Sequence, residues 1–139
     1  MSHPCEILIV DDEPIICERL KAFIEKEGHR VETFIDPREA LKRLEDKDFD
    51  ILISDIRMGE IDGIQVLERA YEKLRHIKVI MITGYATMEL ARESMAKGAF
   101  DFIAKPFKSK EIRATIAKAA EEIQPNNRST VAATQGNRR

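Results

Sequence analysis

The sequence predicts an α/β domain in which helices cover both faces of a doubly wound, five-stranded parallel sheet of order 2-1-3-4-5. Five short apolar stretches alternate along the chain with five stretches of helical periodicity, which is typical of repeated βα units. The runs beginning at Ile7, Ile51 and Val79 are continuously apolar and suit interior strands, whereas Glu32 and Asp101 interrupt the other two, as edge strands permit. Right-handed crossovers then favour this order, with a change of winding direction between the first and third strands.

In the first half of the chain, a strand over residues 6–10 leads to Pro14, which suits the first turn of a helix. Gly28 ends that helix, a strand follows over residues 30–34, and Asp36 is placed to cap a second helix. The apolar residues at helical spacing in these two helices are Ile16, Leu20, Phe23, Ile24, Ala40, Leu41 and Leu44.

The middle of the chain repeats the pattern twice. A strand over residues 51–54 leads through a loop to Asp62, which precedes a third helix. A strand over residues 79–82 precedes a fourth helix that Gly98 ends. The apolar residues at helical spacing here are Ile64, Leu67, Tyr71 and Leu74 in the third helix, and Met88, Ala91 and Met95 in the fourth.

The last unit and the end of the chain differ in composition. A short strand over residues 99–104 is followed by Ser109, which we expect to cap a fifth helix running to about residue 123. Residues 124–139 contain Pro, Asn, Ser, Thr and Gly without periodicity, and we predict a disordered tail or linker there. The folded domain is therefore expected over residues 1–123.

Composition narrows the function classes. A net charge of −2 gives no indication that this domain binds nucleic acid directly. Two cysteines, Cys5 and Cys17, are too few for a disulfide framework, and we expect reduced thiols in a cytoplasmic protein. We expect no signal peptide and no membrane association, since the sequence contains no apolar run of membrane length.

Polar side chains follow four of the predicted strands at the point where each strand ends. Asp11 and Asp12 follow the first strand, Asp55 the third, Thr83 the fourth and Lys105 the fifth. The carboxyl ends of parallel strands meet at one edge of a sheet, so we expect these groups to lie together. Adjacent acids favour a hard cation such as Mg²⁺. With a hydroxyl and an ammonium group, the set has what phosphoryl transfer to a carboxylate requires.

These motifs, in this order, resemble the receiver domain of two-component response regulators. The motifs are Val10-Asp11-Asp12-Glu13-Pro14, Ser54-Asp55-Ile56-Arg57-Met58, Ile82-Thr83-Gly84 and Phe102-Ile103-Ala104-Lys105-Pro106-Phe107. The resemblance covers residues 6–123 and implies a (βα)5 flavodoxin-like (CheY-like) fold. It implies a phospho-accepting signalling domain of a phosphorelay, not an enzyme, with at most slow self-dephosphorylation.

The resemblance also implies site roles. Asp55 is the implied phosphoryl acceptor. Asp11 or Asp12, together with Asp55 and the backbone carbonyl of Arg57, is implied to hold Mg²⁺. The choice between the two adjacent acids stays open. The implied donor is the phosphohistidine of a sensor histidine kinase or a histidine phosphotransfer protein. We expect this chain's own His3, His29 and His76 to be surface residues and not donors.

In the family, phosphorylation is read out by a conformational switch. The resemblance implies that Thr83 and Lys105 bind phosphoryl oxygens, that Thr83 moves inward, and that the aromatic residue Phe102 then turns inward. The face formed by the fourth helix, fifth strand and fifth helix is thereby expected to change for an output domain, a partner or a homodimer. Phe102 as permanent core is the alternative.

Three further positions affect the expected site. Gly59 replaces the proline common in the family, so we expect a more mobile loop. Arg57 and Tyr85 are expected to flank the acceptor and hinder the water that hydrolyses an aspartyl phosphate, which predicts slow self-dephosphorylation. The Lys105-Pro106 bond is expected to be cis, as its relatives suggest.

Two other function classes are compatible with parts of this pattern. A receiver-like interaction module that is never phosphorylated would keep the fold, but the intact acid, Thr83 and Lys105 set argues against it. An aspartate-nucleophile phosphatase needs acids spaced Asp-x-Asp on the first strand, whereas Asp11 and Asp12 are adjacent here. Whether the chain is a stand-alone receiver, a phosphorelay intermediate or part of a longer regulator stays open.

Overall fold

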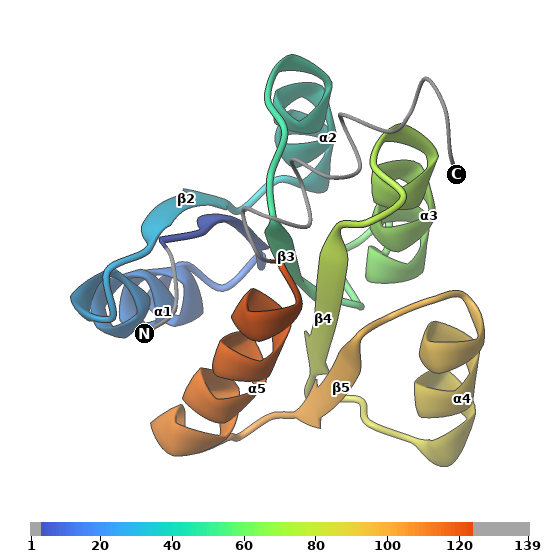
Figure 1. Ribbon diagram of the computed structural model, residues 1–139. Coiled ribbons are helices and arrows are strands. Elements are labelled where there is room, and N and C mark those ends of the chain that lie inside the picture. The colour runs from blue at the N-terminus through green and yellow to red at the C-terminus, as the bar shows by residue number, and fades with distance from the viewer. Residues whose placement is uncertain (1–3, 124–139) are drawn as a thin grey trace.

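Five short strands pair in parallel in the order β2-β1-β3-β4-β5 in a computed structural model that describes residues 4–123 (Figure 1). The predicted order and the placement of β2 and β5 at the edges are confirmed. The elements are β1 Glu6–Val10, α1 Pro14–Lys26, β2 Arg30–Phe34, α2 Pro37–Asp46, β3 Ile51–Asp55, α3 Gly63–Lys73, β4 Lys78–Thr83, α4 Met88–Ala96, β5 Asp101–Ala104 and α5 Ser109–Glu122. The predicted tail, residues 124–139, lies outside the described residues.

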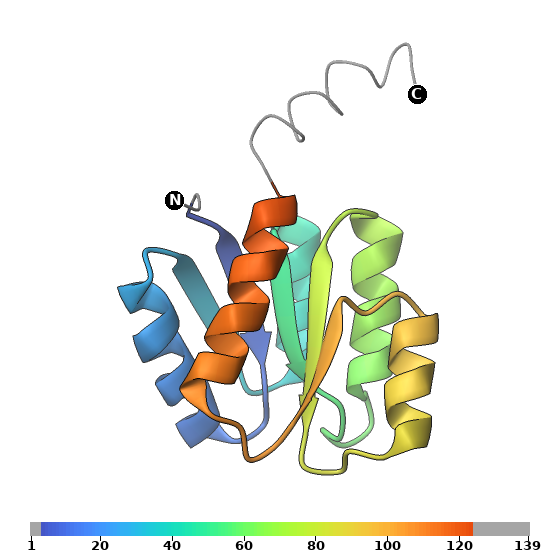
Figure 2. The same cartoon turned by 60° about the horizontal axis from the view of Figure 1, so that its bottom comes forward.

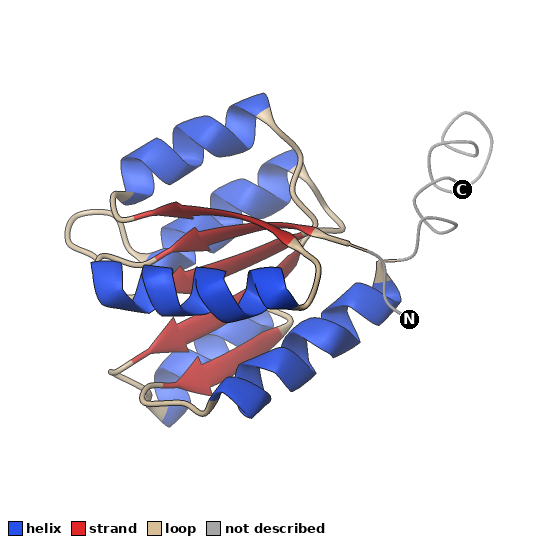
Figure 3. Cartoon of the chain, turned by 90° about the vertical axis from the view of Figure 1, so that its left-hand side faces the viewer, coloured by secondary structure: helices blue, strands red, loops and turns tan. Residues whose placement is uncertain are grey.

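The inner strands are buried on both faces, which explains their continuous apolar composition. Ile7 and Ile9 of β1 pack with α1 and α5, whereas Leu8 and Val10 pack with α2 and α3, because successive side chains of a strand alternate between faces. Helices therefore lie on both sides of the sheet, and the five strand arrows point the same way (Figure 3). None of the described helices is long and apolar enough to cross a membrane.

Side-chain hydrogen bonds cap the starts of α2 and α3, and the cap of α2 by Asp36 is confirmed. Asp36 accepts from the backbone N–H of Arg38 at the start of α2, and Asp62 forms a capping box with Gln65 at the start of α3. The expectation that Ser109 caps the fifth helix is wrong, because Ser109 is already its first residue and Lys108 precedes it. Glu111 instead accepts from the Lys108 N–H at 3.1 Å.

Helix α4 does not bury the residues that mark its periodicity. Met88 and Met95 are 69% and 47% exposed, whereas Ser94 is fully buried. Leu90 and Ala91 are half-buried.

The histidines are only partly as expected. His76 is exposed, and His3 lies outside the described residues. The expectation that His29 is a surface residue is wrong, because it is buried and its Nδ1 accepts from the backbone N–H of Cys5 at 3.0 Å. The turn between α1 and β2 carries the imidazole beneath the start of β1, where it satisfies a backbone donor that begins the strand.

The carboxyl ends of all five strands lie at one edge of the domain, which is the lower edge in Figure 2. At the centre of that edge, the chain winds from β1 to β2 in one direction and reaches β3 and β4 in the other. Ligands of doubly wound sheets bind at this switch of direction. The fold therefore directs attention to the ends of β1 and β3.

Candidate functional site

Three carboxylates meet at the ends of β1 and β3. Val10 pairs with Ser54 across these strands, so the residues that follow, Asp11 and Asp55, lie next to each other. One carboxylate oxygen from each of Asp11, Asp12 and Asp55 lies within 4.8 Å of the others. Asp11 and Asp55 are buried and Asp12 is exposed, so the cluster opens to solvent on one side.

Lys105 supplies the positive charge that this cluster needs. Its Nζ lies 2.8 Å from Asp11 Oδ2, 3.3 Å from Asp55 Oδ2 and 3.5 Å from Glu13 Oε1. The peptide bond between Lys105 and Pro106 is cis, as the resemblance to receiver domains suggests. Lys105 therefore bridges the two buried acids from the end of the edge strand β5.

Burial and charge act against each other in this cluster. Burial raises the pKa of Asp11 and Asp55 above the usual aspartate range, although Lys105 partly opposes the shift. Burial alone would lower the pKa of Lys105, but its hydrogen bonds and charge interactions with the two acids more than offset that effect, so its pKa is raised. Lys105 therefore stays protonated while the two carboxylates resist carrying charge together.

The buried carboxylate oxygens are not equivalent. Asp11 Oδ1 accepts from the Glu13 N–H at 2.9 Å, and Asp55 Oδ1 accepts from the Ile56 N–H at 2.7 Å. Asp11 Oδ2 lies 2.8 Å from Lys105 Nζ and accepts from no other group among the described residues. A buried, incompletely satisfied oxygen beside two further carboxylates fits a hard cation such as Mg²⁺, which prefers oxygen ligands.

Thr83 and Phe102, the two expected switch residues, are placed differently. Thr83 is fully buried at the end of β4, and its Oγ1 accepts from the Tyr85 N–H at 3.0 Å. No described hydrogen bond joins Thr83 to Asp55. Phe102 on β5 is half-buried and packs against the core on the α2 and α3 side of the sheet.

Two large side chains follow the ends of β3 and β4. The guanidinium carbon of Arg57 lies 5.0 Å from the centre of the Tyr85 ring, and both side chains are exposed. The pair forms a cation–π contact between the loops that follow Asp55 and Thr83. Gly59 in the loop after Asp55 has φ +96, a conformation that suits glycine and not the proline common in the family.

Sequence reasoning missed one charged group at the site, Glu13. It was assigned only to the motif at the start of α1, yet its carboxylate lies beside Lys105. The available signal was the run of three consecutive acids after β1. The third acid, Glu13, directly precedes α1 and therefore lies near the edge of the sheet that carries Asp11 and Asp12.

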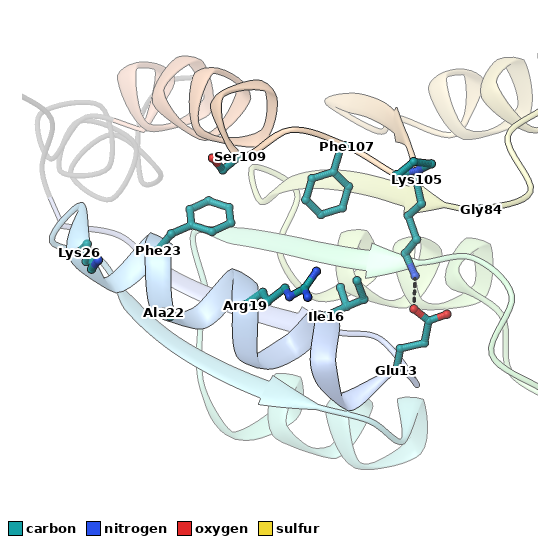
Figure 4. A pocket seen from close by; sticks show the side chains of 11 residues that line it. Glu13, Ile16, Arg19, Ala22, Phe23, Lys26, Gly84, Lys105, Phe107 and Ser109 are labelled. Carbon is teal, nitrogen blue, oxygen red and sulfur yellow. Dashed lines mark ion pairs between the residues drawn. The ribbon is translucent and has the colours of Figure 1, made fainter.

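A groove of about 770 Å³ adjoins the site between α1 and the segment that joins β5 to α5 (Figure 4). Its walls include the apolar side chains Ile16, Phe23 and Phe107, with Glu13 and Lys105 at one end. The remaining lining residues are Arg19, Ala22, Lys26, Gly84, Pro106 and Ser109. Arg19 and Lys26 make no ion pair within residues 4–123, so two unpaired cations border the apolar surface of this groove.

A doubly wound domain with an acidic, lysine-bridged cluster at its switch of direction belongs to the class of α/β domains that place a ligand site at that edge. Residues 7–117 match the family described as the response regulator receiver domain, and the chain belongs to this family. It is therefore a receiver domain of the kind found in the response regulators of two-component systems, which are signalling domains.

The relatives support the same assignment. The transcriptional regulatory protein ZraR of Escherichia coli (strain K12) is 33% identical over 135 residues, which are 96% of this chain and 31% of ZraR. A CheY-like receiver domain protein from Methanospirillum hungatei JF-1 is 32% identical, with a TM-score of 0.82 over 86% of this chain and 96% of that chain. The beryllofluoride-activated NtrC4 receiver domain dimer is 34% identical, with a TM-score of 0.81 over 86% and 98%. The chain thus spans about a third of ZraR and nearly all of the two solved receiver domains.

Proposed function

We propose that this receiver accepts a phosphoryl group from a phosphohistidine onto Asp55 in a Mg²⁺-dependent reaction. The observation that carries the proposal is the arrangement of Asp55 between Lys105, 3.3 Å away, and the carboxylates of Asp11 and Asp12. A carboxylate beside a fixed ammonium group and a cation-binding acid pair is equipped to receive a phosphoryl group and to neutralise its oxygens.

The residues that would hold Mg²⁺ are Asp11 or Asp12, Asp55 and the backbone carbonyl of Arg57. When bound there, the ion supplies positive charge to the oxygens of the transferring phosphoryl group. The incompletely satisfied Asp11 Oδ2 supports this assignment, because it leaves a buried oxygen for an additional positive partner. A cation also relieves the repulsion between the buried acids.

In the transfer step, an oxygen of Asp55 forms a bond to phosphorus as the phosphorus–nitrogen bond of the donor breaks. The electron pair stays on the imidazole nitrogen of the donor, which then takes a proton. Lys105 is already within reach of Asp55 and neutralises the phosphoryl oxygens without a large movement.

The phosphoryl group then shifts a local equilibrium. It adds negative charge and acceptor oxygens at Asp55, and Thr83 Oγ1 exchanges its contact with the Tyr85 N–H for donation to one of these oxygens. Phe102, which is only half-buried, turns inward as Thr83 moves. We propose that the α4-β5-α5 face changes as a result and controls an output domain or partner.

Two partners are proposed. The phosphoryl donor, a histidine kinase or histidine phosphotransfer protein, docks with an amphipathic helix along the groove, where Arg19 and Lys26 favour acidic residues beside an apolar stripe. A second copy of the chain binds the α4-β5-α5 face, where Met88 and Met95 are exposed. The NtrC4 receiver, whose solved form is a dimer, supports this second proposal.

We propose that residues 1–123 form the receiver unit and that residues 124–139 are a linker or tail. The match of residues 7–117 to the family supports the first assignment. The relatives that carry this domain are transcriptional regulators, which supports an output in the control of transcription. We also propose a cytoplasmic location, which suits two buried cysteines that form no disulfide within residues 4–123.

The test is the intact mass of the chain after incubation with Mg²⁺ and acetyl phosphate, beside an Asp55→Asn control. We expect a gain of one phosphoryl group in the wild type and none in the control. If the wild type binds Mg²⁺ but gains no phosphoryl group from acetyl phosphate or from a phosphorylated kinase, the proposal is wrong. The chain then acts as a receiver-like interaction module.

A further inference from the structure

The groove between α1 and the segment that joins β5 to α5 has the size of a small-molecule site. Its volume of about 770 Å³ lies within the range of about 300 to 1,000 Å³ that ligand pockets occupy. The residues of α1 that border it are spaced three or four positions apart, from Ile16 to Lys26, so they share one face of the helix. The groove therefore follows most of the length of α1.

Aromatic side chains from two elements form the apolar walls of this groove. Phe23 lies on α1, whereas Phe107 lies in the segment after β5 and its ring points toward α1 (Figure 4). Both side chains are half-buried and pack, together with Ile16, against the core on this side of the sheet. Because the core supports each ring from one side, the walls are formed before a ligand arrives. Their open sides suit a flat apolar group.

The groove also carries positive charge that no described acid neutralises. Arg19 and Lys26 border it and make no ion pair within residues 4–123. By contrast, Lys21 of the same helix does not border the groove and lies 2.9 Å from Glu25. The planar guanidinium of Arg19 presents donors in the geometry that a carboxylate, sulfonate or phosphate group accepts. Charge complementarity therefore favours an anion in this groove.

We propose that the groove binds a small anion that carries a flat aromatic ring system. The ring system packs between Phe23 and Phe107, and the anionic group binds the guanidinium of Arg19. The carboxylate of Glu13, which lies beside Lys105 at the other end of the groove, directs the anion away from the acidic site. An inorganic anion alone would leave the two rings uncovered, and a neutral aromatic compound would leave the guanidinium unpaired.

Binding of the aromatic anion also excludes the protein donor, a consequence that rests on the proposed function. The donor helix and the anion use the same aromatic walls and the same cations, so the two cannot bind at once. Asp55 does not line the groove, and a small phosphodonor therefore still reaches it. The bound anion thus regulates transfer from a protein donor and leaves the acceptor chemistry intact.

Two fluorescent compounds with the same rings separate the contributions of charge and apolar surface. Anilinonaphthalene sulfonate carries an anionic group, and phenylnaphthylamine has the same rings without it. In titrations of the full chain at low salt, we expect saturable binding of one sulfonate per chain, about 10-fold tighter than binding of the neutral amine. High salt should reduce this difference, because it screens the exposed cations. Equal affinities at low salt, or no saturable binding of the sulfonate, would overturn the proposal.

Arg19→Gln tests the recognition of the anionic group. We expect this variant to bind the sulfonate about 10-fold more weakly and the neutral amine within about twofold of the wild type. Arg92→Gln is the matched control, since Arg92 is exposed on α4 and does not line the groove. If Arg19→Gln binds the sulfonate as tightly as the wild type does, the anion does not bind at this guanidinium and the proposal is wrong.

Phe107→Ala tests the recognition of the rings. It removes one aromatic wall, so we expect both compounds to bind about fivefold more weakly. Phe100→Ala is the matched control, because Phe100 packs against the same core cluster but does not line the groove. Circular dichroism establishes that both variants are folded, which matters because the sulfonate also binds loosely packed chains. Unchanged binding of both compounds by folded Phe107→Ala would place them outside the groove and contradict the proposal.

Phosphoryl transfer in the presence of the sulfonate separates failure of this site from failure of the proposed function. At a sulfonate concentration about 10 times its Kd, we expect transfer from a phosphohistidine protein to slow about 10-fold, and the rate with acetyl phosphate to change less than about twofold. Equal slowing with both donors would place the sulfonate at the acidic site and overturn the proposal. Saturable binding that leaves transfer from the protein donor unchanged would refute the docking of that donor in the groove. A chain that binds the sulfonate and accepts a phosphoryl group from neither donor would refute the proposed function alone.

Discussion

The acidic site and the α4 side of the domain are built in opposite ways. At the site, Asp11 and Asp55 are buried, follow or end interior strands and share the ammonium group of Lys105. At α4, the buried side chain is the unpaired Ser94 and the large apolar residues are exposed. Several electrostatic contacts hold the side chains of the acidic site in place. The buried Ser94 side chain of α4 has no such contact among the described residues.

This difference separates chemistry from response. Phosphoryl transfer needs charges held in place before the donor arrives, since reorganisation during the step would cost rate. A switch needs two positions that differ little in free energy, so that one new charge decides between them. Under the proposed function, the receiver meets both requirements by placing the acids at the ends of interior strands and the responding helix beside an edge strand.

Removing Lys105 should produce the largest effect, because it tests the acidic site directly. Lys105→Met keeps most of the side-chain volume but leaves the two buried carboxylates without their shared cation. We expect phosphorylation by acetyl phosphate to slow by about 10²- to 10³-fold, the usual effect of losing one preorganised charge. Intact mass against time measures the rate.

Lys110→Met is the matched control, since Lys110 is an exposed lysine in the first turn of α5. Its rate should equal that of the wild type. Circular dichroism of both variants establishes that they are folded. A folded Lys105→Met protein that is phosphorylated within about twofold of the wild-type rate would refute the assigned role of Lys105.

Variants of the groove can distinguish the docking of a protein donor from the chemistry of phosphoryl transfer at Asp55. Arg19→Glu with Lys26→Glu reverses two unpaired charges beside the site without touching the carboxylates. The donor is any phosphohistidine protein that transfers its phosphoryl group to the wild-type chain. We expect transfer from this donor to the double variant to slow about 10-fold at low salt, and the rate with acetyl phosphate to stay unchanged. Equal slowing with both donors would show that the groove supports the acidic site and not the docking of a protein donor.

Arg57 and Tyr85 lie between the two regions and sharpen the boundary between them. The two side chains form a cation–π contact, and we predict that this pair shields Asp55 from water. Arg57→Ala with Tyr85→Ala should therefore raise the rate of aspartyl phosphate hydrolysis about fivefold, because water gains access to the acyl phosphate. The measurement is loss of the phosphorylated mass after removal of acetyl phosphate, with Arg69→Ala on exposed α3 surface as the control. Unchanged hydrolysis would contradict the shielding role.

The same contrast explains what could be predicted from the sequence. The approach of Asp11 to Asp55 and the burial of Thr83 follow from two local facts, an apolar run that ends in a polar residue and the common direction of parallel strands. Neither fact depends on detailed packing. For this reason the sheet order and the convergence of site residues could be read before the structure was known.

The features that could not be predicted all depend on packing between elements. Helical periodicity marks Met88 and Met95, but both side chains are exposed and Ser94 is buried instead. The burial of His29 depends on how the turn after α1 passes beneath β1, and the contact of Glu13 with Lys105 depends on where α1 begins relative to β5. Spacing along the chain does not specify such distances.

The smallest predicted effect concerns His29, a buried ionisable group far from the acidic site. It tests whether the acidic site is the sole source of the pH dependence of stability. Burial lowers the pKa of His29, and its Nδ1 must be unprotonated to accept from Cys5. At pH values well above the ordinary histidine pKa of about 6.5, this imidazole is neutral in both the folded and the unfolded chain. As pH falls below that value, the unfolded chain binds a proton before the folded chain does, so this contribution to stability is lost.

Urea unfolding of the metal-free chain between about pH 5 and pH 7.5 measures this loss. His29→Asn places an amide oxygen near the position of Nδ1, retains an acceptor for the Cys5 N–H and removes the titration. We expect its free energy of unfolding to decrease less below about pH 6.5 than that of the wild type, by a fraction of a kcal/mol. His76→Asn, at an exposed position, should follow the wild-type curve. If His29→Asn also follows the wild-type curve, His29 does not contribute to the pH dependence of unfolding. That dependence then comes from other groups, first of all the buried carboxylates Asp11 and Asp55.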